Sequence, residues 1–308
     1  MNSETFSYIL KRLLLAAVTV FAVVTVTFFV MHAVPGGPFL GEKALSQTAL
    51  EALEKKYGMD KPLFSQYLTY LKDALRLDFG PSLKQRGREV TELIREGLQV
   101  SARMGLTAAF FAVVTGIILG AWAALRRNRL ADKLIMVITT AFVSMPSFIM
   151  GTLLLLLFAV KWMLVPANGA MAGGRILPIV TLALYPAAYI TRLTRSAMLD
   201  VLGQDYIRTA RAKGVSAPKI IFGHGLKNAL APVITYLGPM IAYIVTGSLV
   251  VEKIFAVPGI GRAFVSSITD RDYPVIMGTT IVLSVLIVTM NLISDILYKV
   301  VDPRIRLE

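Results

Sequence analysis

The sequence predicts an all-α membrane protein with six transmembrane helices, and three observations support this prediction. The chain of 308 residues is 56% hydrophobic and only 17% charged, whereas about a quarter of the residues in a soluble domain are charged. Its apolar residues are concentrated in six long runs. Its basic residues cluster in short segments beside these runs, which is the distribution that orients membrane proteins. The net charge of +13 therefore indicates membrane topology rather than nucleic-acid binding.

The apolar runs have lengths that suit a bilayer. Residues 13–34 form 22 uncharged positions, which at about 1.5 Å per residue cross a hydrocarbon core of about 30 Å. This run is longer than the apolar part of a signal peptide, and Pro35-Gly36-Gly37-Pro38 suits an exit turn, so we expect an uncleaved first span. The fourth run is short and contains Pro178 and Pro186. The expected spans are residues 13–34, 104–125, 134–160, 176–191, 229–251 and 273–294.

Proline and glycine predict interruptions in this pattern. Pro146 lies within the 27 uncharged residues of the third span and predicts a kink. Gly238-Pro239 predicts a break in the fifth span. In the loop that follows, Gly259 and Gly261 suggest an outer turn in which glycine supplies unusual backbone angles.

A long polar insertion follows the first span. Residues 39–99 contain ten Lys or Arg and nine Asp or Glu, and loops of about this length escape the positive-inside rule. Asp60 and Pro62 are expected to open an amphipathic helix in which apolar residues recur at spacings of three and four. This pattern predicts a folded, helical extracytoplasmic insertion. The apolar residues are Phe64, Tyr67, Leu68, Leu71 and Leu75.

The basic residues also predict the side on which each loop lies. The short segments assigned to the cytoplasm carry two, four, six and three Lys or Arg, whereas the two short outer loops carry two and three. By the positive-inside rule, both termini are cytoplasmic. We therefore divide the chain into residues 1–34 (N-terminus and first span), 35–99 (insertion) and 100–308 (the other five spans), with a cytoplasmic loop at 195–228.

The loop between the fourth and fifth spans has too many charges to enter the membrane. Each charge costs about 2.5–3.5 kcal/mol at the centre of a bilayer, so this segment is expected to lie in water on the cytoplasmic side. Its basic residues are Arg208, Arg211, Lys213, Lys219 and Lys227.

The same loop has a specific local pattern. Asp205 is expected to cap a helix that runs from Ile207 to Lys213, and Gly214 follows where a left-handed C-cap is needed. Ser216 is expected to cap a second helix with Pro218 in its first turn, where the missing N–H costs nothing. The pattern predicts a short helix, a glycine bend and a helix that returns to the membrane.

The segment Tyr206-Ile207-Arg208-Thr209-Ala210-Arg211-Ala212-Lys213-Gly214 resembles the EAA loop of ABC-importer permeases. It departs from the general motif in two places: Arg208 replaces the glutamate, and Asn228-Ala229-Leu230-Ala231-Pro232 replaces Ile-x-Leu-Pro. The peptide-import branch of the family resembles this sequence in both departures. In that family the short helix is the coupling helix, which rests in a groove of a separate ATPase subunit. The ATPase-coupling residues implied are Ile207, Arg208, Thr209, Ala210, Arg211, Ala212, Lys213 and Gly214.

Other segments extend the resemblance over nearly the whole chain. It is closest to the B-type permease subunit of oligopeptide importers, and it implies a multi-pass subunit of a bacterial-type inner membrane, in contact with lipid. The implied partners are a homologous second permease, two ATPase subunits that bind ATP and Mg, and an extracytoplasmic peptide-binding protein. The segments that carry it are Tyr57-Gly58-Met59-Asp60-Lys61-Pro62, Asp78-Phe79-Gly80-Pro81-Ser82 and Glu252-x-x-Phe255-x-x-Pro258-Gly259-x-Gly261.

The residues predict no chemistry that the chain performs itself. It has no cysteine, and its two histidines, His32 and His224, are too few for an ordinary zinc or haem site. It also lacks the GxxxxGK[ST] phosphate loop, the HExxH zinc motif and the GxSxG nucleophile elbow. We expect no catalytic, cofactor-binding or metal-ligating residue and no enzymatic activity, and no pattern identifies the residues that contact cargo.

Two other functions and several cargoes stay open at this point. A gradient-driven carrier usually has carboxylates within its spans, and here the one candidate is Asp295 at the inner end of the last span. A membrane-bound scaffold or enzyme without transport is the other alternative. Among importers, dipeptides, nickel chelates, murein peptides and peptide-like antibiotics are alternatives to oligopeptides, because in such systems the binding protein largely selects the cargo.

Overall fold

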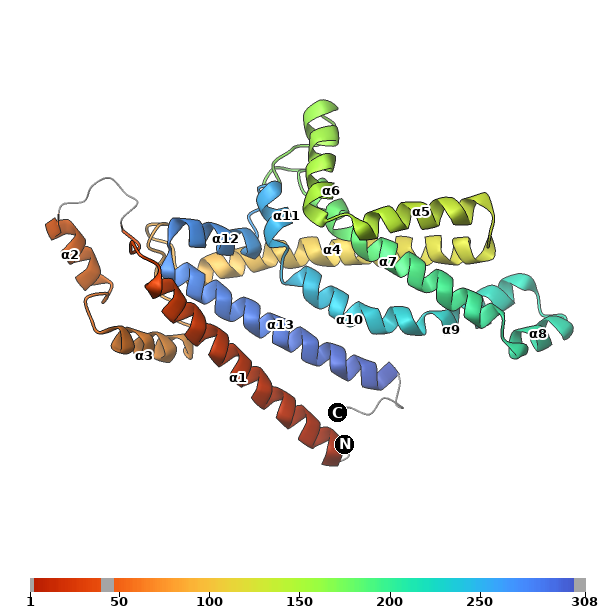
Figure 1. The fold of residues 1–308 in the computed structure, drawn as a ribbon, viewed down its shortest axis with the longest axis horizontal. Helices are drawn as coiled ribbons and strands as arrows, with labels where there is room; N and C mark the ends of the chain where they lie inside the picture. Colours follow the sequence, from red (N-terminus) through yellow and green to blue (C-terminus); the bar gives the residue numbers. More distant parts are fainter. Residues whose placement is uncertain (1–2, 40–46, 302–308) are drawn as a thin grey trace. The chain divides into compact units, whose positions relative to one another are not determined.

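The computed structural model describes residues 3–39 and 47–301, which are helical apart from turns, loops and one isolated β-bridge between Pro81 and Glu89. Figure 1 shows the elements with their labels. They are α1 (Ser3–Ala33), α2 (Gln47–Lys56), α3 (Leu63–Ala74), α4 (Val90–Leu125), α5 (Leu130–Ser144), α6 (Ser147–Leu154), the π-helix η1 (Leu155–Lys161), α7 (Ile176–Leu202), α8 (Asp205–Ala212), the π-helix η2 (Lys219–Leu226), α9 (Lys227–Ala229), α10 (Ala231–Val245), α11 (Leu249–Ile254), α12 (Ile260–Asp270) and α13 (Tyr273–Val301).

The predicted all-α membrane fold is confirmed. Within the described ranges, five helical segments are long and apolar enough to cross a membrane, and a bent pair of helices supplies a sixth crossing if it counts as one span. The segments are Leu10–Ala33, Val90–Leu125, Ile176–Leu202, Ala231–Ile254 and Tyr273–Ile293, with Leu130–Ser144 and Ser147–Lys161 as the bent pair.

The predicted interruption at Pro146 is confirmed as a sharp elbow. The axes of the two helical segments differ by 107°. Met145 ends α5 with an extended backbone (ψ 126°), and Pro146 precedes α6 with ψ 138°. Proline disfavours the helical conformation of the residue before it and has no N–H to donate, so the helix cannot continue through this pair.

The predicted break at Gly238-Pro239 is wrong. Helix α10 passes through Pro239, and the interruption lies at Gly247, whose φ is +86°. A left-handed residue cannot continue a right-handed helix, whereas a proline removes only one hydrogen bond of the helical ladder. The Ser248 side chain then accepts a hydrogen bond from Val251 N (3.3 Å) and caps α11.

The fourth span is longer than its sequence pattern suggested. Helix α7 continues through Pro186 and ends at Leu202, so residues 195–202 of the predicted cytoplasmic loop are helical.

The predicted turn at Gly259 and Gly261 is wrong in detail. Gly259 is the N-cap of α12 with φ −97°, and Gly261 lies buried in the first turn of that helix. Both glycines sit at a helix start, which needs no left-handed backbone.

The chain forms two compact units, of which the first comprises residues 1–100 and 258–288. One apolar cluster of this unit joins α1, α3 and α13 through Phe28, Tyr67 and Met277. The Asp272 carboxylate, 2% exposed, accepts hydrogen bonds from the Ser82 hydroxyl and from Leu83 N (3.1 Å), and so ties the end of the insertion to the start of α13. The predicted helical insertion is present as α2 and α3.

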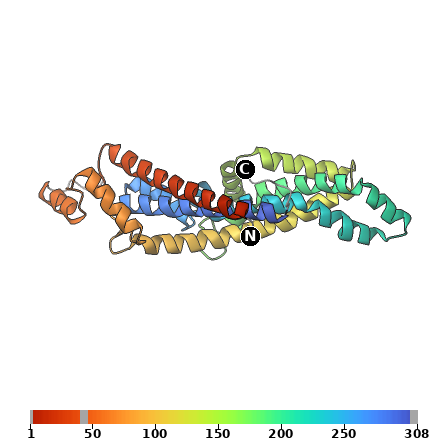
Figure 2. The same cartoon turned by 90° about the horizontal axis from the view of Figure 1, so that it is seen from below.

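The second unit comprises residues 101–257 and 289–308. Helices α5, α6 and α10 all contact α7, and Figure 2 shows α5 and α7 running alongside each other. Glycines let α4 approach α7 closely: a Cβ at Gly116 would lie 2.7 Å from Ile190, and one at Gly120 would lie 2.5 Å from Thr191 O. Helix α7 is therefore the central element of this unit, and it leads directly into α8.

Candidate functional site

The loop after α7 contains the predicted coupling residues on a short helix with a glycine cap. Gly214 has φ +77°; its N–H donates to Arg211 O (3.0 Å) and Val215 N–H donates to Ala210 O (3.1 Å). This pair of bonds is the Schellman arrangement, in which a left-handed residue satisfies the last carbonyls of a helix. The structure therefore confirms the predicted short helix and the left-handed glycine that ends it.

The start of α8 differs from the prediction. Gln204, with φ −72° and ψ 152°, is the N-cap residue and makes no side-chain capping bond, while Asp205 is the first helical residue. At this position Asp205 contributes through its charge near the positive end of the helix rather than as a cap. Its contact with Arg208 Nη1 (3.4 Å) joins two exposed side chains and contributes little to stability.

One face of α8 is anchored and the others are open. Ile207 is fully buried, and α8 packs on η2. Asn228 Nδ2 donates to the Tyr206 hydroxyl (2.9 Å), which links α8 to the helix that returns to the membrane. The predicted coupling residues that remain exposed are Arg208, Thr209, Arg211, Ala212, Lys213 and Gly214, while Ala210 is partly exposed.

The return from α8 has Pro218 in its first turn, as predicted. Pro218 lies in the first turn after Ser216, and Ile220 N donates to Ser216 O (3.1 Å). The helix then widens into η2, whose Gly225 lies against Leu202 of α7. A neighbouring cluster of buried residues, Ala124, Met198 and Ala229, joins α4, α7 and α9. The base under α8 is therefore packed by four helices.

A cavity of about 290 Å³ lies beside α8. Arg211 is its one charged lining residue, and the rest of the wall is apolar. The apolar lining residues are Leu125, Leu202, Val215, Ala217, Ile220 and Ile221.

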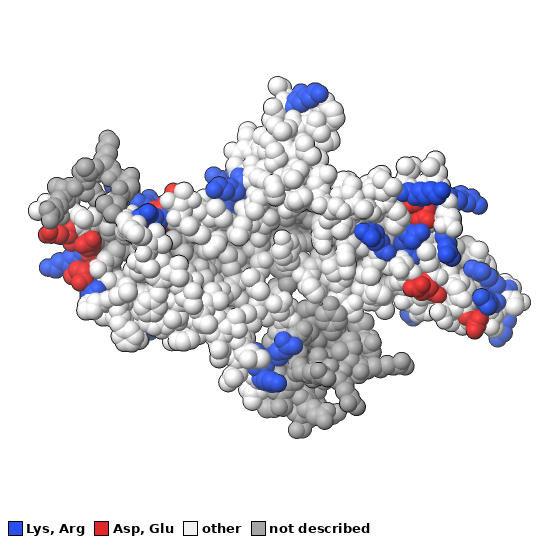
Figure 3. Space-filling view, viewed as in Figure 1, with Lys and Arg blue, Asp and Glu red and all other residues white. Residues whose placement is uncertain are grey.

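The end of unit 2 that carries α8 is strongly basic. Figure 3 shows Lys and Arg gathered there, over α8 and the turn between α4 and α5, with few acidic side chains among them. Such a surface attracts an acidic partner and raises the rate of encounter. The exposed basic residues are Arg126, Arg127, Arg129, Lys133, Arg208, Arg211, Lys213, Lys219 and Lys227.

A buried ion pair lies next to this surface, and sequence reasoning did not find it. Arg195 Nε and Nη2 lie 2.6 and 2.8 Å from the two carboxylate oxygens of Asp132. The carboxylate also accepts the N–H of Asn128 (2.8 Å), a residue with φ +64° in the turn between α4 and α5. The available signal was that Asp132 is the one acid among four basic residues in this segment.

A second cavity, of about 570 Å³, lies at the elbow between α5 and α6. It contains no charged residue, and α7 and α10 complete its wall. Three tyrosines contribute to the lining, and Met145 also lies there. The tyrosines are Tyr185, Tyr236 and Tyr243. Sequence reasoning left these residues unassigned, although tyrosine inside an apolar span was a usable signal.

The sequence drew attention to two acidic residues: Glu252, in the segment that resembles peptide permeases, and Asp295, the candidate carboxylate of a gradient-driven carrier. Glu252 of the peptide-permease segment is fully buried and accepts a hydrogen bond from Ser101 Oγ (2.7 Å), while Phe255 is buried beside Gly151. The side chain of Asp295 lies outside the described part of the chain, as do Pro303 and Arg304. Among the described residues, no group of three or more acidic or histidine side chains could hold a metal ion.

The sequence and the fold both match known transport proteins. The family model described as "Binding-protein-dependent transport system inner membrane component" matches residues 116–307, and the model of an N-terminal region of such membrane components matches residues 5–80. The chain is 47% identical over 301 residues to the dipeptide transport system permease protein DppB of Bacillus subtilis, covering 97% of this chain and 98% of DppB. It is 42% identical over 302 residues to the oligopeptide transport system permease protein OppB of Haemophilus influenzae, covering 97% and 99%.

One solved structure has a similar fold. A chain of the methionine ABC transporter MetNI, in an inward-facing conformation, superposes with a TM-score of 0.55. The two chains are 19% identical, and the match covers 68% of this chain and 96% of the other. At this identity the likeness concerns the fold.

Proposed function

Since this chain belongs to the family of binding-protein-dependent transport system inner membrane components, we propose that it forms half of the translocation pathway of an ATP-driven oligopeptide importer. Its predicted relation to the peptide branch of ABC-importer permeases is confirmed. Dipeptides are the second candidate cargo, and the 47% identity to a dipeptide permease favours them.

The main observation behind this proposal is that α8 has an exposed face, while its opposite face is packed against the rest of unit 2. Ile207 fixes the helix from below, and Gly214 fixes the direction of the chain beyond it. A short helix held in this way transmits a push better than a flexible loop does. ATP binding would close two partner ATPase subunits, α8 would move with its groove, and the spans would open toward the outside.

The charge of the α8 end predicts the chemistry of the ATPase partner. Nine exposed basic side chains there favour a groove with an acidic rim. The apolar cavity beside Arg211 is suited to receive one apolar side chain of that partner. Binding of the ATPase should therefore depend on salt, with an apolar contact that persists when the charges are screened.

The lining of the elbow cavity supports peptides as the cargo. Its walls carry no charge, so they neither repel nor select charged side chains of a peptide. Tyrosine hydroxyls can bind peptide backbone groups, and methionine adapts its shape to different side chains. We assign the cavity to this subunit's share of the cargo pathway.

The remaining assignments follow from this role. The chain would lie in a bacterial-type inner membrane with both termini in the cytoplasm. It would pair with a homologous permease and receive peptide from an extracytoplasmic binding protein. Catalysis, ATP and Mg belong to the ATPase subunits, so this chain would be no enzyme.

The test is to purify the chain with its neighbouring permease and ATPase subunits and to reconstitute the complex in vesicles. ATPase activity and uptake should rise together when binding protein loaded with a peptide is added, and peptides of two to about eight residues would rank the cargoes. The matched control is the same complex with an ATPase subunit that cannot hydrolyse ATP. Uptake by the chain alone, driven by an ion gradient, would contradict the proposal.

A further inference from the structure

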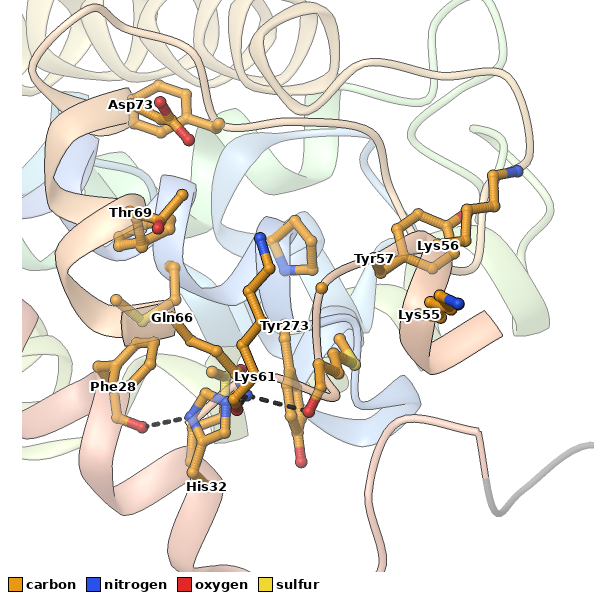
Figure 4. Close-up of a pocket in the computed structure, with 17 residues that line it drawn as sticks. Phe28, His32, Lys55, Lys56, Tyr57, Lys61, Gln66, Thr69, Asp73 and Tyr273 are labelled. Carbon is orange, nitrogen blue, oxygen red and sulfur yellow. Dashed lines mark hydrogen bonds between the residues drawn. The ribbon is translucent and has the colours of Figure 1, made fainter. Parts of the chain in front are cut away.

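Unit 1 contains a cavity of about 410 Å³ that is remote in sequence from α8 and the elbow (Figure 4). Its wall is formed by the last turns of α1, the turn between α2 and α3, α3 itself and the first turn of α13. A cavity of this size accommodates a small ligand or the headgroup of a larger one.

The cavity lies at the ends of two apolar segments that are long enough to cross a membrane. His32 comes from the last turn of the apolar segment Leu10–Ala33, and Tyr273 opens the segment Tyr273–Ile293. Their rings are 5.2 Å apart, and aromatic rings of this kind favour the boundary between lipid and water. If both segments cross the bilayer, the end of the first and the start of the second lie at a boundary between lipid and water.

The lining has an excess of positive charge. Of the described residues that line it, Lys55, Lys56 and Lys61 are basic and Asp73 is the one acid. Among the described residues, none of these four side chains forms an ion pair. In the view of Figure 4, the Lys61 side chain extends between Tyr273 and the side chains of α3. Lys56 lies over the Tyr57 ring, 5.5 Å from its centroid, while Lys61 and Asp73 leave charges of both signs without an ion-pair partner among the described residues.

The segment that carries Lys61 is held in place. Gln66 Nε2 donates to Met59 O (3.0 Å) and to Lys61 O (2.8 Å), which fixes the turn between α2 and α3. The His32 ring is likewise fixed by a hydrogen bond between its Nδ1 and Phe28 O (2.8 Å). The backbone around the cavity is thus formed before any ligand arrives.

A buried polar atom also indicates a missing partner. The hydroxyl of Tyr70, a lining residue, is enclosed and has no hydrogen-bond partner in the described part of the chain. Burial raises the pKa of Tyr70, so the group stays a neutral donor at physiological pH. An enclosed hydroxyl without a partner is unfavourable, and a bound ligand or water would satisfy it.

We propose that this cavity binds the headgroup of an aminophospholipid, with its phosphate at Lys61 and its ammonium at Asp73. The acyl chains would lie along the exposed apolar residues of α1 that share the face of His32, where Leu14 and Phe21 are 64% and 56% exposed. A purely anionic headgroup would match the lysines but leave Asp73 unpaired. The site depends on membrane insertion and is independent of the coupling role of α8.

The experiment uses the complete complex, washed into detergent and then offered phosphatidylethanolamine, phosphatidylglycerol or phosphatidylcholine. Native mass spectrometry counts the retained lipids. Wild-type protein should retain phosphatidylethanolamine about fivefold better than phosphatidylglycerol, as one charged contact predicts. Lys61→Gln should reduce retention of both lipids, whereas Asp73→Asn should remove only the preference for the amino headgroup. Lys72→Gln and Asp60→Asn change exposed charges outside the cavity and should behave as wild type.

A second measurement distinguishes loss of lipid binding from misfolding of a variant. Tyr70→Phe removes the unpartnered hydroxyl, so Tm without lipid should be unchanged or higher, while the rise in Tm on adding phosphatidylethanolamine should shrink. Equal retention by wild type, Lys61→Gln and Asp73→Asn would overturn the proposal. So would full stabilisation by inorganic phosphate alone, because the site would then serve a free anion rather than a lipid.

Discussion

Arg195 and Asp132 form a bidentate ion pair that joins α7 to the first turn of α5. The two N–O distances are 2.6 and 2.8 Å, and the Asp132 side chain is 3% exposed. Because α7 leads into α8 after Leu202, this pair fixes the helix that carries the coupling helix against the helix that leads to the elbow. The pair thereby connects the two surfaces to which we assign coupling and cargo.

Asp132→Asn should uncouple these two surfaces. Removing one partner of a buried ion pair leaves the other uncompensated, and because Arg195 is partly exposed we expect a cost of up to about 3 kcal/mol. Reconstituted complexes should show about tenfold slower uptake, while basal ATP hydrolysis persists. Thermal unfolding and uptake measured on the same preparation separate loss of stability from loss of coupling.

Two controls make this prediction specific. Glu92→Gln breaks an exposed contact with Arg88 (3.1 Å), and it should change neither Tm nor uptake noticeably. The exchange of partners, Asp132→Arg with Arg195→Asp, should restore part of the uptake. If Asp132→Asn transports as well as wild type, the pair has no part in coupling.

Gly214→Ala should impair transport without preventing membrane insertion. A Cβ at Gly214 meets no atom within 4 Å, so the penalty arises only from φ +77°. A left-handed alanine costs about 1–2 kcal/mol, enough to loosen the end of α8. Gly214→Pro should be more severe, because it also removes the N–H that donates to Arg211 O. Uptake and the amount of protein in membranes are the two measurements.

Gly214→Asn is the matched control. Asparagine tolerates the left-handed conformation better than alanine does, so this variant should transport at an intermediate rate. The order glycine, asparagine, alanine, proline would follow backbone strain. Any other order would assign the defect to the size or polarity of the new side chain.

Local rules of helix formation predicted a large part of this structure. Pro146 marked the elbow and Gly214 marked the end of α8, because both residues act through their own backbone geometry. The apolar runs marked the spans, since every backbone group must be satisfied inside the helix in lipid.

The features that escaped prediction depend on partners distant in sequence. Nothing in the sequence pairs Asp132 with Arg195, 63 positions away, and only the fold brings the two side chains together. Tyr185 and Tyr236 lie on different helices, and their common cavity exists only after α7 and α10 pack. Pro239 was misread because its helix continues through it until Gly247.

Ile207→Ala should weaken the packing of α8 against the rest of unit 2. Ile207 is fully buried, and truncating a buried isoleucine to alanine costs about 2–5 kcal/mol in a soluble core. We expect weaker association with the ATPase subunits and slower uptake, measured by co-purification and by transport. Ile94→Ala, which truncates a buried isoleucine of unit 1, controls for a general loss of stability. An equal defect in both variants would contradict an anchoring role for Ile207.

Tyr185→Phe should change the handling of cargo and leave the energy supply intact. Tyr185 lines the uncharged cavity at the elbow, and we expect its hydroxyl to bind peptide backbone groups there. Losing one neutral hydrogen bond costs about 1 kcal/mol, so uptake at low peptide concentration should fall about fivefold, with basal ATPase activity unchanged. Tyr189→Phe is the matched control, because Tyr189 lies one turn further along α7 and outside the cavity lining. If Tyr189→Phe lowers uptake as much as Tyr185→Phe does, the cavity is not the surface that the peptide meets.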